Sequence, residues 1–214
     1  TSEDVMDATF NVDLINEVGK CIGEDCLAMG YSGLYGPGIN MHRTAYSGRN
    51  FEYYAEDPFV AGTICAAEVQ GIQSKGVYVY LKHVALNDSE TSRRGVNTWL
   101  NEQTAREIYL EVADKAITDG GAWSVMTGFN RWGATWCGAN ANLLTGFLRG
   151  ELGMRGMCIT DFSGSSQYMD LVDGLIAGSD IWDSPMPKIP TTKAANYEND
   201  AYIVTQMLNA MHHI

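Results

Sequence analysis

Short apolar or β-branched runs alternate along the chain with longer segments in which apolar residues recur at helical spacing. This alternation is typical of β–α units that build a parallel sheet. It predicts five strands, at residues 30–35, 77–82, 123–127, 157–161 and 179–182. It also predicts six helices, at residues 13–29, 58–75, 101–119, 140–151, 166–177 and 198–212. The segment 184–199 contains three prolines and no clear period, so we interpret it as a loop or linker.

Polar residues follow four of the predicted strands, at 36–40, 82–83, 127–130 and 161. An open doubly wound sheet gathers its ligand residues at one switch point, whereas a (β/α)8 barrel places them after several strands. A complete barrel takes about 250 residues. The sequence therefore predicts an α/β fold of the (β/α)8 TIM-barrel type that is incomplete, with about five β–α units. We expect residues 1–183 to form this partial barrel domain and residues 184–214 to form a linker and a closing helix.

Composition narrows the classes of partner. The chain has 214 residues, of which 45% are hydrophobic, and a formal net charge of −12. That charge argues against nucleic acid or an anionic membrane surface as a partner and favours a neutral or cationic ligand. No apolar run approaches the roughly 20 residues of a membrane span. The five cysteines lack paired metal-ligand spacing, so we expect free thiols, no metal site, no cofactor and a cytoplasmic location.

Asp161 is the strongest single candidate for chemistry. It ends the short apolar strand predicted at 157–161 and is followed by Phe162, Ser163 and Gly164. A carboxylate at such a junction is held rigidly and remains accessible to substrate, as a nucleophile requires. Taken alone, the same residue is more simply a helix-capping or turn carboxylate, so further motifs are needed to decide.

Several motifs, taken together in order, resemble the catalytic barrel of glycoside hydrolase family 3. They are GPGINMHR at 36–43, GRNFEYYAEDP at 48–58, KH at 82–83, VMT at 125–127, LRGELG at 148–153 and ITDF at 159–162. Their order and spacing are similar to those of the family, and the resemblance runs from about residue 11 to residue 182. The run at 48–58 is the most specific of them.

The resemblance implies a retaining hydrolase of β-linked glycosides, similar to a β-glucosidase or β-xylosidase. Asp161 would be the nucleophile that forms a covalent glycosyl-enzyme intermediate. The positions that match the family's substrate-binding residues are Arg49, Lys82, His83, Met126, Phe129 and Phe162. The first three would grip sugar hydroxyls, and Phe162 stands where many relatives carry tryptophan.

Four of these binding residues also have a simpler structural explanation. Arg49 could form an ion pair with Glu52 or Glu56, and His83 could be a buried core histidine. For Met126 and Phe129, packing in the core is nearly as good an explanation as contact with a sugar. Glu102 and Arg106 are four residues apart in a predicted helix, so we interpret them as an ion pair outside the site.

Retention of configuration requires a second carboxyl group about 5 to 5.5 Å from the nucleophile. No residue of this chain matches the family's position for it, and in most relatives that glutamate comes from a separate domain. We therefore expect a small carbohydrate as substrate and a second domain of the same protein as the source of the acid/base. The fragment alone is then expected to be inactive. Two alternatives remain open: a non-catalytic sugar-binding or scaffolding domain, and a Schiff-base lyase that uses Lys82.

Overall fold

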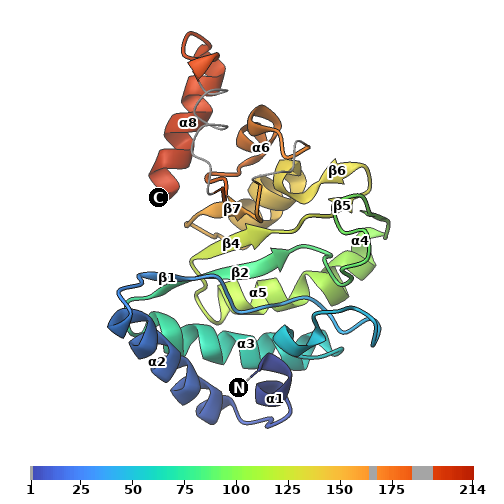
Figure 1. Cartoon of the computed structure of the whole chain (residues 1–214), viewed down its shortest axis with the longest axis vertical. Coiled ribbons are helices and arrows are strands. Elements are labelled where there is room, and N and C mark those ends of the chain that lie inside the picture. Colours follow the sequence, from blue (N-terminus) through green and yellow to red (C-terminus); the bar gives the residue numbers. More distant parts are fainter. Residues whose placement is uncertain (1, 164–167, 185–194) are drawn as a thin grey trace.

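The computed structural model describes residues 2–163, 168–184 and 195–214 (Figure 1). The helices are α1 (Glu3–Asp7), α2 (Val12–Ala28), α3 (Pro58–Gln73), α4 (Glu102–Thr104), α5 (Glu111–Thr118), α6 (Leu171–Ala177) and α8 (Ala201–His213). The strands are β1 (Gly33–Leu34), β2 (Tyr78–Val84), β3 (Asn97–Thr98), β4 (Ser124–Thr127), β5 (Arg131–Trp132), β6 (Thr135–Trp136) and β7 (Cys158–Thr160). Shorter or wider helical segments are η1 (Asn50–Glu52), η2 (Ala105–Tyr109), η3 (Cys137–Ala139) and η4 (Asn142–Glu151), of which η2 and η4 are π-helices.

The main sheet is parallel, in the order β1-β2-β4-β7. Parallel strands need crossover connections, and the chain supplies them as helices: α3 precedes β2, α5 precedes β4 and η4 precedes β7. Helices α2, α3 and α5 lie together on one side of the sheet, next to β1 and β2 (Figure 1). In the described part of the chain the carboxyl ends of β2, β4 and β7 therefore lie next to one another at one edge.

Side chains of the sheet alternate between two environments, as the period of a strand dictates. Val79 and Leu81 of β2 belong to the large core cluster that the helices cover. Tyr80 belongs to a second cluster on the other face, with Met126, Met157 and Ile159. Since Lys82 lies two residues after Tyr80, and Asp161 lies two residues after Ile159, both continue this second, inner face beyond the cluster.

The local sequence explains why helix α3 begins at Pro58. Asp57 accepts a hydrogen bond from the Val60 amide at 3.0 Å, and Pro58 occupies the first helical position. The helix packs closely on α2 because glycines face each other at the contact. A Cβ atom on Gly71 would overlap the carbonyl oxygen of Asn16 and lie 2.9 Å from the Cα atom of Gly19. The close contact of the two helices therefore requires glycine at position 71.

The predicted strands at 30–35, 77–82, 123–127 and 157–161 are present as β1, β2, β4 and β7, with β1 reduced to two residues. The strand predicted at 179–182 is wrong, because only Ile181 forms a bridge, to Ile159. The side chain of Asp180 accepts the Cys158 amide at 2.7 Å and so takes a β7 hydrogen bond that a neighbouring strand would otherwise make.

The predicted helices differ from the structure in three places. The helix at 101–119 is divided into α4, the π-helical η2 and α5, and the helix at 140–151 is π-helical over η4. The helix at 166–177 is present as α6 from Leu171 to Ala177, and residues 166–167 lie outside the described residues. Most of the loop predicted at 184–199 also lies outside them. The pattern did not predict α1 or the small sheet β3-β5-β6.

Candidate functional site

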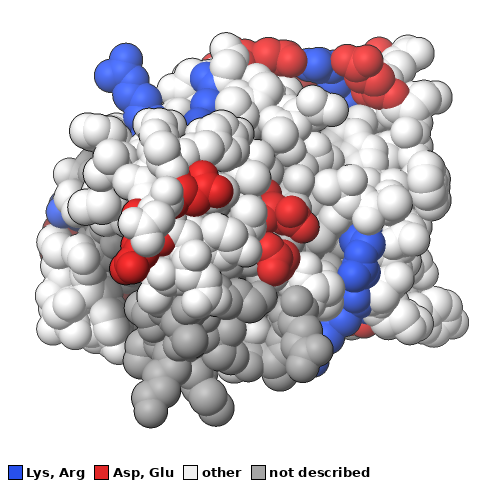
Figure 2. Space-filling model, turned by 90° about the horizontal axis from the view of Figure 1, so that it is seen from above, with Lys and Arg blue, Asp and Glu red and all other residues white. Residues whose placement is uncertain are grey.

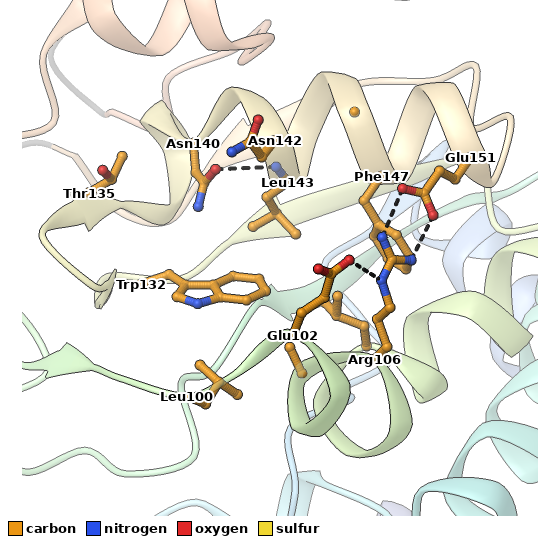
Figure 3. Close-up of a pocket in the computed structure, with 13 residues that line it drawn as sticks. Leu100, Glu102, Arg106, Trp132, Thr135, Asn140, Asn142, Leu143, Phe147 and Glu151 are labelled. Atoms are coloured by element: carbon orange, nitrogen blue, oxygen red, sulfur yellow. Dashed lines mark hydrogen bonds and ion pairs between the residues drawn. The ribbon is translucent and has the colours of Figure 1, made fainter.

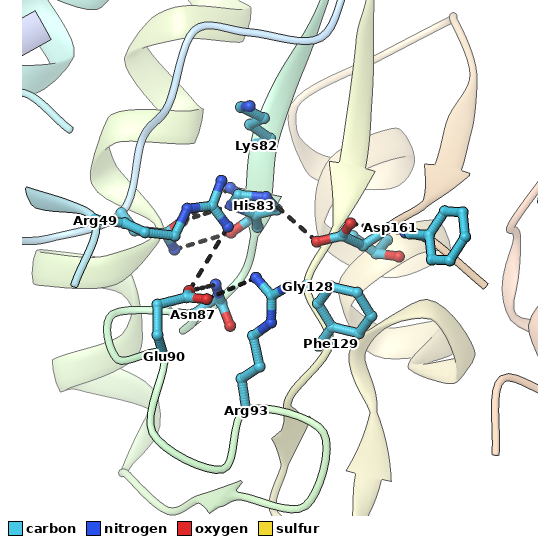
Figure 4. Close-up of polar contacts among 12 residues, drawn as sticks. Arg49, Lys82, His83, Asn87, Glu90, Arg93, Gly128, Phe129 and Asp161 are labelled. Atoms are coloured by element: carbon cyan, nitrogen blue, oxygen red, sulfur yellow. Dashed lines mark hydrogen bonds and ion pairs between the residues drawn. The ribbon is translucent and has the colours of Figure 1, made fainter. Parts of the chain in front are cut away.

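The inner face of the main sheet ends in a polar pocket of about 400 Å³. It is lined by Tyr35, Arg49, Lys82, His83, Glu90, Arg93, Met126, Asp161 and Asp183. Figure 4 shows His83 at the end of β2 facing Asp161, which follows β7, with Arg49 and Glu90 on the side of β2 away from Asp161. Residues from five separate segments of the chain therefore meet at the carboxyl ends of the strands.

Asp161 is anchored through its backbone and one carboxylate oxygen. Its amide donates to Thr127 of the neighbouring strand at 3.2 Å, and its Oδ1 accepts from the Phe162 amide at 2.7 Å. Its Oδ2 is buried, lies 3.3 Å from His83 Nε2, and makes no hydrogen bond to a described residue. The carboxylate is thus oriented on one side and leaves the other oxygen available for chemistry.

Opposing effects act on the ionisation of Asp161. Burial raises the pKa of its carboxyl group, whereas the Phe162 amide and the nearby positive charges lower it. Those charges belong to Arg93, Arg49 and Lys82. The net pKa is above the ordinary value for aspartate, so the carboxylate needs these cations to remain ionised in a buried setting.

His83 is held in place by the amide of Asn40. The His83 backbone amide donates to Asn40 Oδ1 at 2.9 Å, and Asn40 Nδ2 donates to the His83 carbonyl oxygen at 3.0 Å. The side chain is only 2% exposed. Burial lowers the pKa of its imidazole well below the usual value, and Arg49, Lys82 and Arg93 lower it further. The ring is therefore neutral at neutral pH.

Two glutamates connect the cations around the pocket. Glu52 accepts from Arg49 Nε and lies 3.5 Å from Lys82 Nζ. Glu90 lies 2.6 Å from an Arg93 nitrogen and 3.6 Å from an Arg49 nitrogen. With Asp161 and Asp183 included, these described groups comprise three cations and four carboxyl groups, which suits an uncharged polar ligand better than an anion.

The structure brings five of the seven predicted site residues to this pocket: Arg49, Lys82, His83, Met126 and Asp161. Phe129 does not line it. Its side chain is 1% exposed and packs with Trp136 and Met169, as the core explanation expected. Phe162 is 40% exposed and lies directly beside Asp161 without lining the pocket. The ion pair expected between Arg49 and Glu52 is present, and it coexists with the exposure of Arg49 to the pocket.

Four lining residues are not among the predicted site residues: Tyr35, Glu90, Arg93 and Asp183. Arg93 reaches the pocket because its guanidinium lies 4.2 Å above the Phe129 ring (Figure 4). Strand alternation could have indicated the position of Asp183. Ile181 pairs with Ile159, so strand alternation places Asp183 on the same face as Asp161. Hydrogen bonds from Ser163 to the Asp183 carbonyl and from the Asp183 amide to Thr160 hold it there, at 2.7 and 3.0 Å.

Within residues 2–163, 168–184 and 195–214, no cluster of three or more His, Cys, Asp or Glu side chains could hold a metal ion. Among the same residues no helix is long and apolar enough to cross a membrane. On the face drawn in Figure 2, several acidic side chains lie in the central part, and most Lys and Arg side chains lie toward its edges.

Comparison with known proteins gives consistent results. Residues 2–181 match the family model described as the glycosyl hydrolase family 3 N terminal domain. The chain is 38% identical over 173 residues to thermostable beta-glucosidase B of Acetivibrio thermocellus and 35% identical over 176 residues to a beta-glucosidase of Rhizobium radiobacter. These matches cover 81% and 82% of this chain, but only 22% and 21% of those proteins. The chain therefore spans about a fifth of the curated relatives it matches.

Solved structures give the same picture for the fold. Beta-glucosidase 3B from Thermotoga neapolitana, in complex with alpha-D-glucose, superposes with a TM-score of 0.92 at 32% sequence identity. The match covers 100% of this chain and 30% of that structure. The likeness confirms the predicted α/β fold of an incomplete TIM-barrel type.

Proposed function

Since the chain belongs to glycosyl hydrolase family 3, we propose that it carries the nucleophile and part of the sugar-binding site of a retaining hydrolase of β-linked glycosides. The observation that supports this most is the setting of Asp161. Its carboxylate ends a buried strand, is oriented through Oδ1, and has Oδ2 directed toward a neutral histidine in a pocket that also contains three cations.

Such a carboxylate can attack an anomeric carbon. The bond from Asp161 oxygen to the sugar forms as the bond to the leaving-group oxygen breaks, and a general acid protonates that oxygen. Water then cleaves the glycosyl ester with the same acid/base group now accepting a proton, which restores the carboxylate. The acid/base is proposed to come from a part of the protein outside this chain, because most of the length of the relatives lies outside the match.

The other polar residues of the pocket suit a polyol. The Lys82 ammonium lies 3.5 Å from Glu52 Oε2, a long ion pair that leaves donor capacity for a sugar hydroxyl. Arg49 and His83 line the same pocket, and Met126 supplies an apolar wall at 3% exposure. Phe162 is exposed beside Asp161 and could cover a sugar face, whereas Phe129 would act indirectly by supporting Arg93. We propose β-glucosides or β-xylosides as the substrate class.

An activated 2-deoxy-2-fluoro β-glucosyl donor tests the proposal, because its good leaving group needs little acid assistance. Intact-mass analysis of the folded chain should show the addition of one fluoroglucosyl group. The matched control is Glu102→Gln, which removes a carboxylate at an ion pair outside the pocket and should leave labelling unchanged. A chain that binds glucose without forming the adduct would instead be a sugar-binding domain, and borohydride trapping of a carbonyl ligand on Lys82 would support the lyase alternative.

A further inference from the structure

The imidazole of His83 has two possible partners at Nδ1, an amide oxygen that can only accept and a hydroxyl that can also donate. Tyr53 Oη and Asn40 Oδ1 each lie 3.3 Å from Nδ1. The orientation of the Asn40 amide is fixed by the His83 backbone, which donates to Oδ1 and accepts from Nδ2. Asn40 Oδ1 can therefore only accept a hydrogen bond from the ring. The tyrosine hydroxyl is the partner that can donate to Nδ1.

The contact between Nε2 and Asp161 decides between the two tautomers of the neutral ring. If Nδ1 carries the proton, it donates to Asn40, and the Nε2 lone pair then points at Asp161 Oδ2, 3.3 Å away. That arrangement places a lone pair against a carboxylate and is repulsive. If Nδ1 accepts from Tyr53, the proton is on Nε2, and this polar N–H group lies next to the ionised Asp161 carboxylate, with Nε2 3.3 Å from Oδ2. That contact is attractive and favours the ionised carboxylate.

Tyr53 is well placed for this task. Its side chain is 0% exposed, and its ring makes an edge-on contact with the His83 ring at a centroid distance of 6.4 Å. Burial raises the pKa of the Tyr53 hydroxyl, so it remains a protonated donor at every pH at which the protein would work. The Arg49 guanidinium lies 5.9 Å from the centre of the same ring and helps to fix it.

We propose that Tyr53 is a positioning residue of the active site. Its hydroxyl donates to His83 Nδ1, holds the imidazole in the Nε2–H tautomer, and thereby lets His83 stabilise the ionised form of Asp161. No covalent bond forms or breaks in this arrangement, since Tyr53 acts only through the ring it orients. The expected effect on reaction rate rests on the proposed function of Asp161. The tautomer of His83 does not depend on that function.

Other groups around Asp161 do not replace this N–H group. Those that line the pocket are Arg49 near η1, Lys82 and His83 of β2, Glu90 and Arg93 of the following loop, and Tyr35 and Asp183. Glu52 pairs with Arg49 and Lys82. The cations among them act through charge, and His83 Nε2 lies 3.3 Å from Asp161 Oδ2. Whether Nε2 carries a proton therefore decides whether the ring presents an N–H group or a lone pair to Oδ2.

The tautomer can be measured directly by NMR of the chain labelled with ¹⁵N-histidine. The sequence has four histidines, and His83→Gln assigns the signal of interest. In the parent protein at neutral pH we expect a protonated Nε2 and an unprotonated Nδ1 at His83. Finding the proton on Nδ1 in the parent would overturn the proposal without any further variant.

The decisive variant is Tyr53→Phe, with Tyr54→Phe as its matched control. Both remove one buried tyrosine hydroxyl, but the Tyr54 hydroxyl donates to Glu68 at 2.6 Å and does not contact His83. We expect Tyr53→Phe to shift His83 toward the Nδ1–H tautomer and Tyr54→Phe to leave it unchanged. A folded Tyr53→Phe protein whose His83 remains in the Nε2–H form would contradict the proposal.

Labelling kinetics separate this proposal from the proposed function. Tyr53→Phe should slow formation of the fluoroglucosyl adduct by about 5- to 10-fold, the value of one buried hydrogen bond. It should also move the acidic limb of the pH profile to higher pH, because the ionised Asp161 carboxylate loses the adjacent N–H group of His83. If the parent forms no adduct but the tautomer of its His83 responds to Tyr53→Phe, the proposed hydrolase function is wrong and the proposed Tyr53–His83 hydrogen bond is supported. If the parent reacts and Tyr53→Phe changes neither rate nor profile, the role of Tyr53 fails alone.

Discussion

Two regions of the molecule place one arginine between two glutamates, and only one of them has the properties of a reactive site. Arg106 lies between Glu102 and Glu151 at the edge of a cavity of about 630 Å³ (Figure 3). Arg49 lies between Glu52 and Glu90 at the smaller pocket of about 400 Å³ (Figure 4). The larger cavity is therefore not the one where the predicted site residues meet.

The difference lies in what remains unpaired. Arg106 makes two parallel bonds to Glu151, at 2.6 and 2.9 Å, and a third to Glu102 at 2.9 Å. Its partners are more than half exposed, so water screens these charges. At the pocket, the same kind of arginine is more buried and its glutamates are shared with Lys82 and Arg93. Because these glutamates are shared, the pocket cations keep N–H groups that can bind a ligand. One oxygen of Asp161 is also available to it.

The largest expected effect is that of Asp161→Asn. An amide cannot attack the anomeric carbon, so the rate of reaction with an activated β-glucoside should fall by about 10⁴-fold or more. Stopped-flow or discontinuous measurement of leaving-group release tests this. Because the variant is isosteric, its melting temperature should remain near that of the parent, and a fall in rate of less than tenfold would rule out Asp161 as nucleophile.

Removal of a pocket cation should have the next largest effect. We expect Lys82→Met to slow labelling of Asp161 by about 10- to 100-fold, since one charged hydrogen bond is lost. Lys82 lowers the pKa of Asp161. Its loss should raise that pKa and move the acidic limb of the labelling rate to higher pH. Lys75→Met, at an exposed pair with Glu24, is the control and should change neither quantity.

Stability should depend on a buried ion pair that lies outside the pocket. Asp180, 1% exposed, lies 2.6 Å from an Arg149 nitrogen and 2.8 Å from His213 of α8. Asp180→Ala leaves the buried guanidinium of Arg149 without this carboxylate, so we expect a loss of about 3 to 5 kcal/mol in the free energy of unfolding. Urea unfolding measures it. A stability equal to that of the parent would show that burial of a charge pair here has no structural value.

A smaller, pH-dependent effect is expected at Glu68. Burial raises the pKa of its carboxyl group to about 7. The folded state therefore holds a proton on Glu68 between about pH 4.5 and 7 that the unfolded state has released, and stability from this group falls as pH rises through that window. Relative to Glu68→Gln, the parent should lose about 3 kcal/mol between pH 4.5 and 7.5. Parallel stability curves for the two proteins would contradict the raised pKa.

The smallest effect is expected at Arg106, whose ion pairs with Glu102 and Glu151 lie at the larger cavity. Arg106→Met should leave the labelling rate of Asp161 unchanged, because Arg106 and its glutamates do not line that pocket. The same labelling assay measures it, with Lys82→Met as the positive comparison. A large loss of rate in Arg106→Met would remove the contrast between the two regions.

The sequence predicted those parts of the molecule in which local pattern and final structure agree. Strand alternation and the motif at 159–162 located Asp161, and the KH pair located the end of β2. Arg93 was missed because its position depends on a loop that folds back over the Phe129 ring, a contact that spacing does not encode. The strand at 179–182 failed for a similar reason, since a side chain of Asp180 replaces a backbone hydrogen bond.

The most direct test of the central claim is to locate the fluoroglucosyl group by peptide mapping after labelling. Four described carboxyl groups lie at or next to the pocket: Glu52, Glu90, Asp161 and Asp183. The account predicts that the modification is found on Asp161 alone and is absent from Asp161→Asn. Modification of Asp183 or of either glutamate, with Asp161 unmodified, would contradict it.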